Sequence, residues 1–297
     1  MGVDVLHKPR IVLLIDKPNW VFRSYARSFT KELSQYFIFK TISASDKPTL
    51  DLSNVDILHV LGGEQLYHLH SLKPHVRVVK GVYSHRWEYQ RGESAEEFYN
   101  KYLLDAHVIT VPNRFLLYKL SDLPTPVKFF PEGVDAHLFA CAPPRSGALR
   151  AGWAGNPNDP IKNFEWVKKA CEGVCKLKLA QGQFNEQEMV DFYRDIDVII
   201  SASWAEGSPR PILEAMSCGR YPVSFPVGMV PELVVPGEHG TIVNKHSVDA
   251  LREALEWCCE NRDTVRAIGQ RNADWIRSTH TWSHTIHYLK DVYTSLL

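Results

Sequence analysis

Two glutamates with prolines between them mark the most informative stretch of the sequence. Glu206 and Glu214 stand eight positions apart in "SASWAEGSPRPILEAMSCG", residues 201–219. Proline has no amide hydrogen and a fixed φ angle, so Pro209 and Pro211 suit the first turn of a helix and predict that a helix begins there. We therefore expect Glu206 on a loop and Glu214 in the first turns of the helix.

The residues before this helix have the pattern of a buried strand. Residues 197–203, "DVIISAS", are mainly apolar and β-branched, which predicts a strand, a glycine-containing loop and a helix in succession. The amino end of a helix presents backbone amides and the positive end of its dipole, which favours a bound phosphate. The alternative is that Glu214 only complements the helix dipole and that Glu206 is a solvated loop charge.

Length and composition limit the class of protein. A chain of 297 residues predicts about two domains. Its 34 basic and 34 acidic residues balance, so no global positive charge indicates nucleic acid or an anionic membrane. The six cysteines form no C-x-x-C pair with a histidine partner, so neither a zinc site nor a disulfide framework is predicted. We expect a cytoplasmic chain with no integral membrane segment, with peripheral membrane contact left open.

Short apolar runs alternate with helical patterns along the first half of the chain. Helices are expected between most of the runs, for example at residues 22–36 and 95–104. The predicted strands are residues 10–16, 36–42, 55–61, 76–82, 106–112 and 127–131. Strict alternation of strand and helix predicts a parallel sheet that is covered on both faces.

The pattern stops at residues 141–148, which are rich in proline and glycine and are predicted to form a linker. It then restarts, with strands expected at 149–155, 176–181, 197–203, 220–225 and 240–243, and helices near 163–174, 185–195, 210–218 and 229–235. The tail is helical in pattern from 247 to 297. The predicted domains are residues 1–140 and 148–281, followed by a last helix at 282–297.

Three segments resemble the retaining GT-B glycosyltransferases of family four, the glycosyl transferases group 1. Residues 204–243 resemble the E-x(7)-E region of that family, 129–139 ("FFPEGVDAHLF") its turn before the domain linker, and 152–170 the first strand and loop of its second domain. The resemblance implies an α/β GT-B fold with two Rossmann-like domains facing across a cleft and a C-terminal helix crossing back to the first. It also implies transfer of a sugar from a nucleoside-diphosphate sugar to a hydroxyl acceptor, with retained anomeric configuration.

The resemblance assigns roles to both glutamates. Glu214 would bind the two hydroxyls of the nucleotide ribose, because a carboxylate can accept two hydrogen bonds at once. Glu206 would face the sugar hydroxyls, helped by the backbone amides of Gly207 and Ser208. Lys162 would stabilise the charge that grows on the leaving diphosphate in the transition state, as a catalytic cation.

One departure from the family pattern concerns the phosphates. An arginine usually accompanies the lysine, but Asn156 stands in its place. We predict that Arg210 supplies the missing charge, with a plain surface arginine as the alternative.

Three further residues are predicted on the donor side. His85 follows a predicted strand and resembles a family histidine that hydrogen-bonds the donor sugar. Gly182 resembles a residue that shapes the nucleobase pocket, and Val230 belongs to a segment that runs past the diphosphate. The plainer alternatives are a loop histidine, a turn glycine and a helix-capping segment.

The acceptor side is predicted from two loops. Lys17, Asn19 and Trp20 belong to the first loop, and Trp87 follows His85 and Arg86 in the sequence. For Trp20 a place in the core is the alternative. A saccharide or a lipid-linked acceptor is expected first. A hydroxymethylated base in DNA is the second possibility, because residues 20–31 mix aromatic and basic side chains.

No metal and no cofactor are expected besides the donor substrate. The predicted strands have no D-x-D pair at their carboxyl ends, and a lysine with helix amides can do the work of a magnesium ion. The rival hypotheses are a sugar-nucleotide epimerase, a phosphorylase-like enzyme and a non-catalytic protein that binds sugar nucleotides. The sequence leaves open the donor's base and sugar, the group that accepts the acceptor's proton and the oligomeric state.

Overall fold

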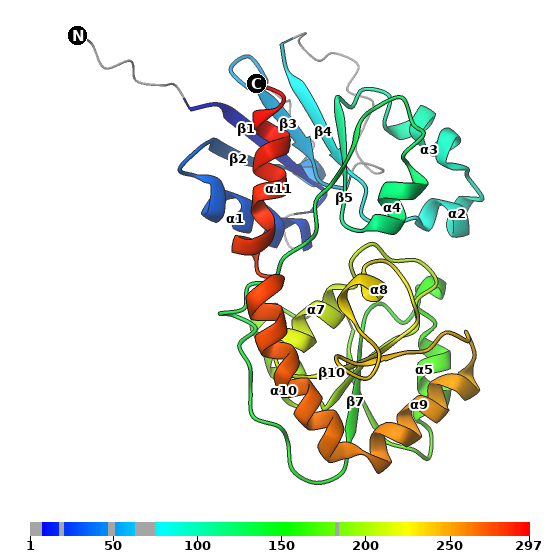
Figure 1. The fold of residues 1–297 in the computed structure, drawn as a ribbon. Helices are drawn as coiled ribbons and strands as arrows, with labels where there is room; N and C mark the ends of the chain where they lie inside the picture. Colours follow the sequence, from blue (N-terminus) through cyan, green and yellow to red (C-terminus); the bar gives the residue numbers. More distant parts are fainter. Residues whose placement is uncertain (1–7, 18–20, 47–50, 63–74, 182–183) are drawn as a thin grey trace. The chain divides into compact units, whose positions relative to one another are not determined.

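The structure is a computed structural model, and it describes residues 8–17, 21–46, 51–62, 75–181 and 184–297. The chain divides into two compact units. The first consists of Met1–Tyr83, Gln90–Pro131 and Thr285–Leu297, and the second of Ser84–Tyr89 and Glu132–His284. Each unit contains one parallel β-sheet with helices, as the alternating sequence pattern predicts (Figure 1).

The sheet of the first unit has the strand order β2-β1-β3-β4-β5-β6, and every pair of neighbours is parallel. Its strands are β1 (Arg10–Ile15), β2 (Ile38–Ser43), β3 (Ile57–Val60), β4 (Arg77–Gly81), β5 (Val108–Val111) and β6 (Val127–Phe129). Strands β3 and β5 are buried along their whole length, as expected for a sheet covered on both faces. The helices are α1 (Val21–Leu33), α2 (Arg86–Arg91, shared between the units), α3 (Ala95–Tyr102) and α4 (Arg114–Lys119).

The last helix, α11 (Trp282–Thr294), begins in the second unit and belongs to the first from Thr285 onward. This is the return to the first domain that the resemblance implied. Tyr293 is fully buried, and its hydroxyl lies 2.7 Å from Nδ1 of His59 on β3. Burial lowers the pKa of His59 to about 3, so its ring is neutral at physiological pH.

The sheet of the second unit has the order β11-β10-β9-β7-β8 and is also parallel. Its strands are β7 (Arg150–Ala154), β8 (Lys176–Ala180), β9 (Val198–Ser201), β10 (Tyr221–Ser224) and β11 (Thr241–Ile242). The helices are α5 (Phe164–Cys171), α6 (Glu186–Arg194), α7 (Arg210–Ser217), α8 (Val230–Leu233), α9 (Val248–Glu260) and α10 (Arg262–Thr279). Helix α5 packs against α9, and α7 against α10 (Figure 1).

Both faces of this second sheet are buried by helices. Ile199 and Ile200 are neighbours on β9, and their side chains point to opposite faces because strand side chains alternate. Ile199 belongs to the core that contains Met216 of α7, and Ile200 to the core that contains Val167 of α5. The predicted strands and helices are thus confirmed to within a few residues, and α7 begins where the two prolines predict, with Pro209 as its N-cap. The short helices α2 and α4 were not predicted.

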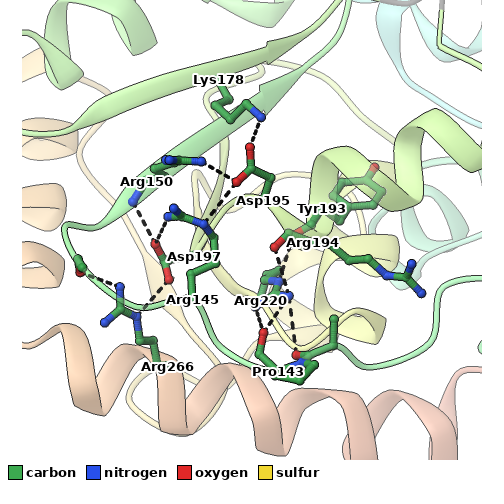
Figure 2. Close-up of polar contacts among 12 residues, drawn as sticks. Pro143, Arg145, Arg150, Lys178, Tyr193, Arg194, Asp195, Asp197, Arg220 and Arg266 are labelled. Atoms are coloured by element: carbon green, nitrogen blue, oxygen red, sulfur yellow. Dashed lines mark hydrogen bonds and ion pairs between the residues drawn. The ribbon is translucent and has the colours of Figure 1, made fainter.

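The predicted linker, residues 141–148, lies inside the second unit, because the long segment of that unit already begins at Glu132. A group of charged residues holds this segment at the amino ends of β7 and β9 (Figure 2). We name the group the linker cluster, which consists of Arg145, Arg150, Lys178, Asp195, Asp197 and Arg266.

Asp197 lies at the centre of the linker cluster, with a side chain that is 0% exposed. It accepts hydrogen bonds from the backbone N–H of Arg150 and from Nε of Arg266, both at 2.9 Å. Arg145, on the predicted linker, lies 3.5 Å from Asp197 and 3.1 Å from Asp195. The buried Arg220 donates through Nε to the carbonyl of Tyr193 at 2.8 Å and through its other nitrogens to the carbonyl of Pro143 at 3.4 Å.

All six cysteines are free thiols. Among the described residues, no helix has both the length and the apolar character needed to cross a bilayer.

Candidate functional site

The strand order of the second unit singles out one position for a ligand. From β7 the chain continues to β8 on one side of it, then returns to β9 on the other side. In open α/β sheets, ligands bind at the carboxyl ends of the strands where the strand order reverses in this way. The loops at this switch point follow β7 and β9, and they carry Lys162 and Glu206 respectively.

The structure brings these two residues into contact, although they are 44 positions apart in the chain. Nζ of Lys162 lies 2.5 Å from Oε1 of Glu206, and the two side chains are 20% and 10% exposed. An ammonium group has three N–H donors, so Lys162 can bind a second acceptor while it contacts Glu206. The pair therefore combines a cation with a carboxylate at the switch point, in a place that solvent still reaches.

Asn163 fixes the two loops to each other. Its side chain donates to the carbonyl of Ala202 at 2.8 Å and accepts from Nε1 of Trp204 at 3.0 Å. Its φ is +50°, and among the residues that the structure describes it is the one non-glycine residue with positive φ. Asparagine tolerates this left-handed conformation better than most residues. Sequence reasoning missed Asn163, because its loop partners on the β9 side cannot be identified from local spacing.

A second contact places the segment Ser84–Tyr89 beside the same turn. Nη1 of Arg86 lies 2.6 Å from Oδ2 of Asp159, and Oδ1 of Asp159 accepts from the backbone N–H of Ile161 at 3.1 Å. Asp159 thereby caps the 3₁₀ turn Pro160–Lys162. His85 is buried and adjoins Arg86. Asp159 was also missed, although an aspartate directly before a proline is a sequence signal for such a cap.

Glu214 lies one turn into α7 and is 9% exposed. Its Oε1 accepts from Nε and Nη2 of Arg210 at 3.1 and 2.8 Å, and its Oε2 accepts from the hydroxyl of Tyr193 at 2.8 Å. Burial and the carboxylate of Glu214 raise the pKa of Tyr193 well above its usual value, so its hydroxyl keeps its proton. The contact between Arg210 and Glu214 has the i,i+4 spacing of helical ion pairs, a signal that the sequence did contain.

The loop before α7 packs tightly against the loop that follows β10. The carbonyl of Gly207 accepts from the backbone N–H of Met229 at 2.8 Å, and Oγ of Ser208 lies 2.7 Å from Sδ of Met229. Gly228 has φ +55°, and a Cβ there would lie 2.2 Å from the carbonyl oxygen of Gly207. Only glycine fits such a close approach of two backbones.

The amino end of α7 offers fewer amide donors than its sequence position suggests. Pro209 and Pro211 have no N–H, and the N–H of Ile212 donates to the carbonyl of Pro209 at 2.9 Å. At α8, the N–H of Val230 donates to the carbonyl of Val227 at 3.1 Å. An anion bound at this junction would therefore depend more on cationic side chains than the sequence predicts, because part of the positions are prolines without an amide hydrogen and part of the amides bond within local turns.

The other predicted site residues have less connection with this group. Asn156 is exposed, and its side-chain oxygen accepts from the backbone N–H of Asn158 at 3.0 Å in a local turn. Trp87 is 0% exposed, so the structure shows it packed in the protein, and its acceptor role stays a prediction. Lys17 is exposed after β1 of the first unit. Asn19, Trp20 and Gly182 lie outside the described residues.

Comparison with known proteins finds a family that matches part of the chain. Residues 176–275, from β8 into α10, match the sequence model of the family described as "Glycosyl transferases group 1". A D-inositol 3-phosphate glycosyltransferase of Corynebacterium glutamicum is 27% identical over 54% of the chain. The enzyme of the same name from Saccharomonospora viridis is 32% identical over 36% of the chain. The chain covers 38% and 25% of the length of these two relatives.

Two solved structures have similar folds over nearly the whole chain. Sucrose-phosphate synthase from Thermosynechococcus elongatus has a TM-score of 0.76 at 14% identity, covering 97% of this chain and 99% of that one. HepE of Anabaena, solved in complex with UDP and glucose, has a TM-score of 0.73 at 12% identity, covering 97% of this chain and 100% of that one. Residues 176–275 are thus similar to the Glycosyl transferases group 1 family, and the chain has the α/β fold with two Rossmann-like domains that these two structures share.

Proposed function

We propose that the protein is a retaining GT-B glycosyltransferase of family four, which moves a sugar from a nucleoside-diphosphate sugar to a hydroxyl acceptor. The observation that carries this proposal is the contact of Lys162 with Glu206 at the switch point of the second sheet. Glu214 extends the site on the adjacent helix α7. A cation, a sugar-facing carboxylate and a ribose-binding carboxylate are the groups that a sugar-nucleotide donor needs.

Each group has a role in the proposed reaction. Glu214 accepts hydrogen bonds from the ribose hydroxyls, and Glu206 accepts from hydroxyls of the donor sugar, with Gly207 and Ser208 at the same loop. Lys162 donates to the diphosphate, whose negative charge grows as the glycosidic bond breaks. His85 forms a hydrogen bond with the donor sugar. It lies on the segment after β4 that the contact of Arg86 with Asp159 holds beside the Lys162 turn.

The proposed chemistry retains the anomeric configuration. The bond between the anomeric carbon and the phosphate oxygen breaks, and the acceptor oxygen bonds to the same carbon on the same face. The proton of the acceptor hydroxyl passes to the departing phosphate oxygen, which gains negative charge in this step. We propose that the reaction needs no divalent cation, because Lys162 supplies positive charge next to the diphosphate.

The donor proposed first is a UDP-sugar, because HepE, similar in fold, was solved with UDP and with UDP-glucose. The proposed acceptor is a saccharide or a lipid-linked hydroxyl compound. Inositol 3-phosphate belongs in the first acceptor panel, because relatives that share parts of the chain are named for it.

The test is a screen of nucleotide sugars against an acceptor panel, read by mass spectrometry for product and for free nucleoside diphosphate. We expect diphosphate release that depends on the acceptor and a product whose anomeric configuration, read by NMR, matches that of the donor. The rates should be unchanged in EDTA. Epimerised donor without release would establish an epimerase instead, and donor binding without any turnover would establish a binding protein.

A further inference from the structure

We infer that Arg210 and Tyr193 are positioning residues that hold the Glu214 carboxylate ready for the donor's ribose, and that Arg210 is not the substitute phosphate cation. The inference rests on the proposed function, because it gives Glu214 the ribose-binding role. It concerns two residues outside the proposed reaction steps, one on α7 and one at the end of α6.

The guanidinium of Arg210 donates hydrogen bonds to two neighbours within the second unit, Glu214 and Gly133. Nε and Nη2 donate to the same oxygen of Glu214, at 3.1 and 2.8 Å. Nη1 donates to the carbonyl of Gly133 at 2.9 Å. All three nitrogens thus have an acceptor, which uses three of the five N–H donors and fixes the direction of the two that remain. Among the described residues the Lys162 ammonium has Glu206 as its one hydrogen-bond partner, so its two other N–H donors can turn toward a phosphate, which makes it the better phosphate ligand.

The carbonyl of Gly133, which accepts the hydrogen bond from Nη1 of Arg210, is held in place as well. Gly133 lies so close to the start of α11 that a Cβ on it would meet the backbone nitrogen of Trp282 at 2.5 Å. A side chain at this position would force one of the two backbones to shift. Arg210 therefore contacts a backbone segment that packs closely against the start of α11, and it holds Glu214 from that contact.

Tyr193 holds the other oxygen of the carboxylate. Its hydroxyl donates to Oε2 at 2.8 Å, and its ring is 0% exposed and packs edge-on against Phe139 with centroids 5.9 Å apart. Because the ring is packed on all sides, its surroundings hold the hydroxyl next to the carboxylate. The two oxygens of Glu214 are thus fixed by two different elements.

The consequence is a carboxylate that is oriented before a ligand arrives. A carboxylate has about four acceptor sites, and the contacts to Arg210 and Tyr193 occupy three of them, so one site on Oε2 stays open for a ribose hydroxyl. The nearby cation offsets the cost of burying the Glu214 charge. Orientation in advance removes part of the entropy cost of binding, so affinity for the ribose hydroxyls should depend on Arg210 and Tyr193 although neither contacts the ligand.

The experiment compares a nucleotide that has the ribose hydroxyls with one that lacks them. The loss of a positioning residue and the loss of a phosphate-binding residue then give different results. Binding of UDP and of 2′,3′-dideoxy-UDP is measured by calorimetry in the wild type, in Arg210→Gln and in Tyr193→Phe. We expect the wild type to bind UDP about 10- to 100-fold more tightly than the dideoxy compound, since hydrogen bonds to a charged group carry this discrimination. In Arg210→Gln the ratio should fall close to one, because UDP binding weakens and dideoxy binding does not. Tyr193→Phe should lower the ratio several-fold.

A phosphate-binding Arg210 gives a different result, namely equal weakening of both ligands with the ratio unchanged, and this would overturn the inference. Arg194→Gln, which removes an exposed arginine of α6, is the matched control and should leave both affinities unchanged. If Arg210→Gln does not fold, Arg210→Lys is the second variant. It keeps the charge but cannot form the paired hydrogen bonds of Nε and Nη2 with Glu214, so its ratio of UDP affinity to dideoxy-UDP affinity should be lowered in the same way. Wild-type protein that binds neither ligand would instead overturn the UDP-sugar proposal itself.

Discussion

The two ends of the second sheet both carry charged residues, but they use them differently. At the amino end, Asp197 is fully buried and contacts Arg145, Arg266 and a backbone N–H, and the whole group ties residues 141–148 to the strands (Figure 2). At the carboxyl end, Lys162 and Glu206 lie on loops and remain partly exposed. Charges with several fixed partners hold the chain together, whereas charges that keep hydrogen-bonding capacity can bind a ligand.

Backbone conformation differs between the two ends in one respect. The carboxyl end has the left-handed Asn163 at a contact between two loops, whereas the left-handed residues at the amino end, Gly147, Gly173 and Gly219, are all glycines. Unusual backbone conformations persist where the surrounding structure enforces them, and they gather at functional sites. The amino end should therefore determine stability and the carboxyl end activity, and four predictions test this division.

The largest effect is expected from Asp197→Ala at the amino end. The substitution leaves Arg266 and Arg145 without their buried carboxylate, which should cost about 3 to 5 kcal/mol of unfolding free energy. Urea denaturation measures the loss, and Asp191→Ala, at an exposed aspartate of α6, is the control. The activity of the folded fraction should be nearly unchanged. A stable variant without activity would contradict the division.

At the carboxyl end, Lys162→Ala should lower kcat roughly 10²- to 10³-fold, because one electrostatic contact to the transition state is lost. Its melting temperature should shift little, since the contact with Glu206 is only partly buried. Steady-state kinetics and thermal melting give the two readouts. Lys168→Ala, at an exposed lysine of α5, is the matched control and should behave as wild type. A large stability loss with unaltered kcat would make Lys162 structural.

Asn163 should affect both properties, because it joins the two loops of the site. Asn163→Ala loses two side-chain hydrogen bonds and places alanine at positive φ, which should cost about 2 kcal/mol of stability. Asn163→Gly should recover about 1 kcal/mol of this, since glycine accepts the backbone conformation. Denaturation of both variants measures the difference. Equal stability of the alanine and glycine variants would show that the backbone conformation contributes nothing.

The smallest effect is expected from Asp195→Asn in the exposed part of the linker cluster. The Lys178 ammonium, followed by the two arginines, holds the pKa of Asp195 below its usual value despite some burial. A carboxylate with a lowered pKa stabilises the folded state above its unfolded pKa, and this contribution disappears as the pH falls through the folded pKa. Because Asp195 is 37% exposed, solvent screening limits the effect to under about 1 kcal/mol at pH 7.

Urea denaturation of wild type and Asp195→Asn at pH 7 and at about pH 3 measures this dependence. The difference between the two proteins should shrink at the lower pH. A difference that stays constant with pH would show that the aspartate acts through packing and not through charge.

Particular residues show how far the sequence leads toward the site. The α7 start at Arg210 and the loop position of Glu206 follow from two prolines and an apolar run. The contact of Arg86 with Asp159 spans 73 positions, and no local pattern indicates it. The predicted linker lies within the second unit, because Arg145 and the carbonyl of Pro143 find charged partners that only the folded chain brings near.

The sequence by itself determined the alternation of strands and helices, the two α/β halves and the helix start that separates the two glutamates. These features depend on backbone constraints and on side-chain periodicity, which are contained in consecutive residues. Only the tertiary structure decided which charges meet, with Lys162 beside Glu206 and Tyr193 beside Glu214. Such contacts depend on the order of strands in the sheet and on the paths of loops, which involve residues far apart in the chain.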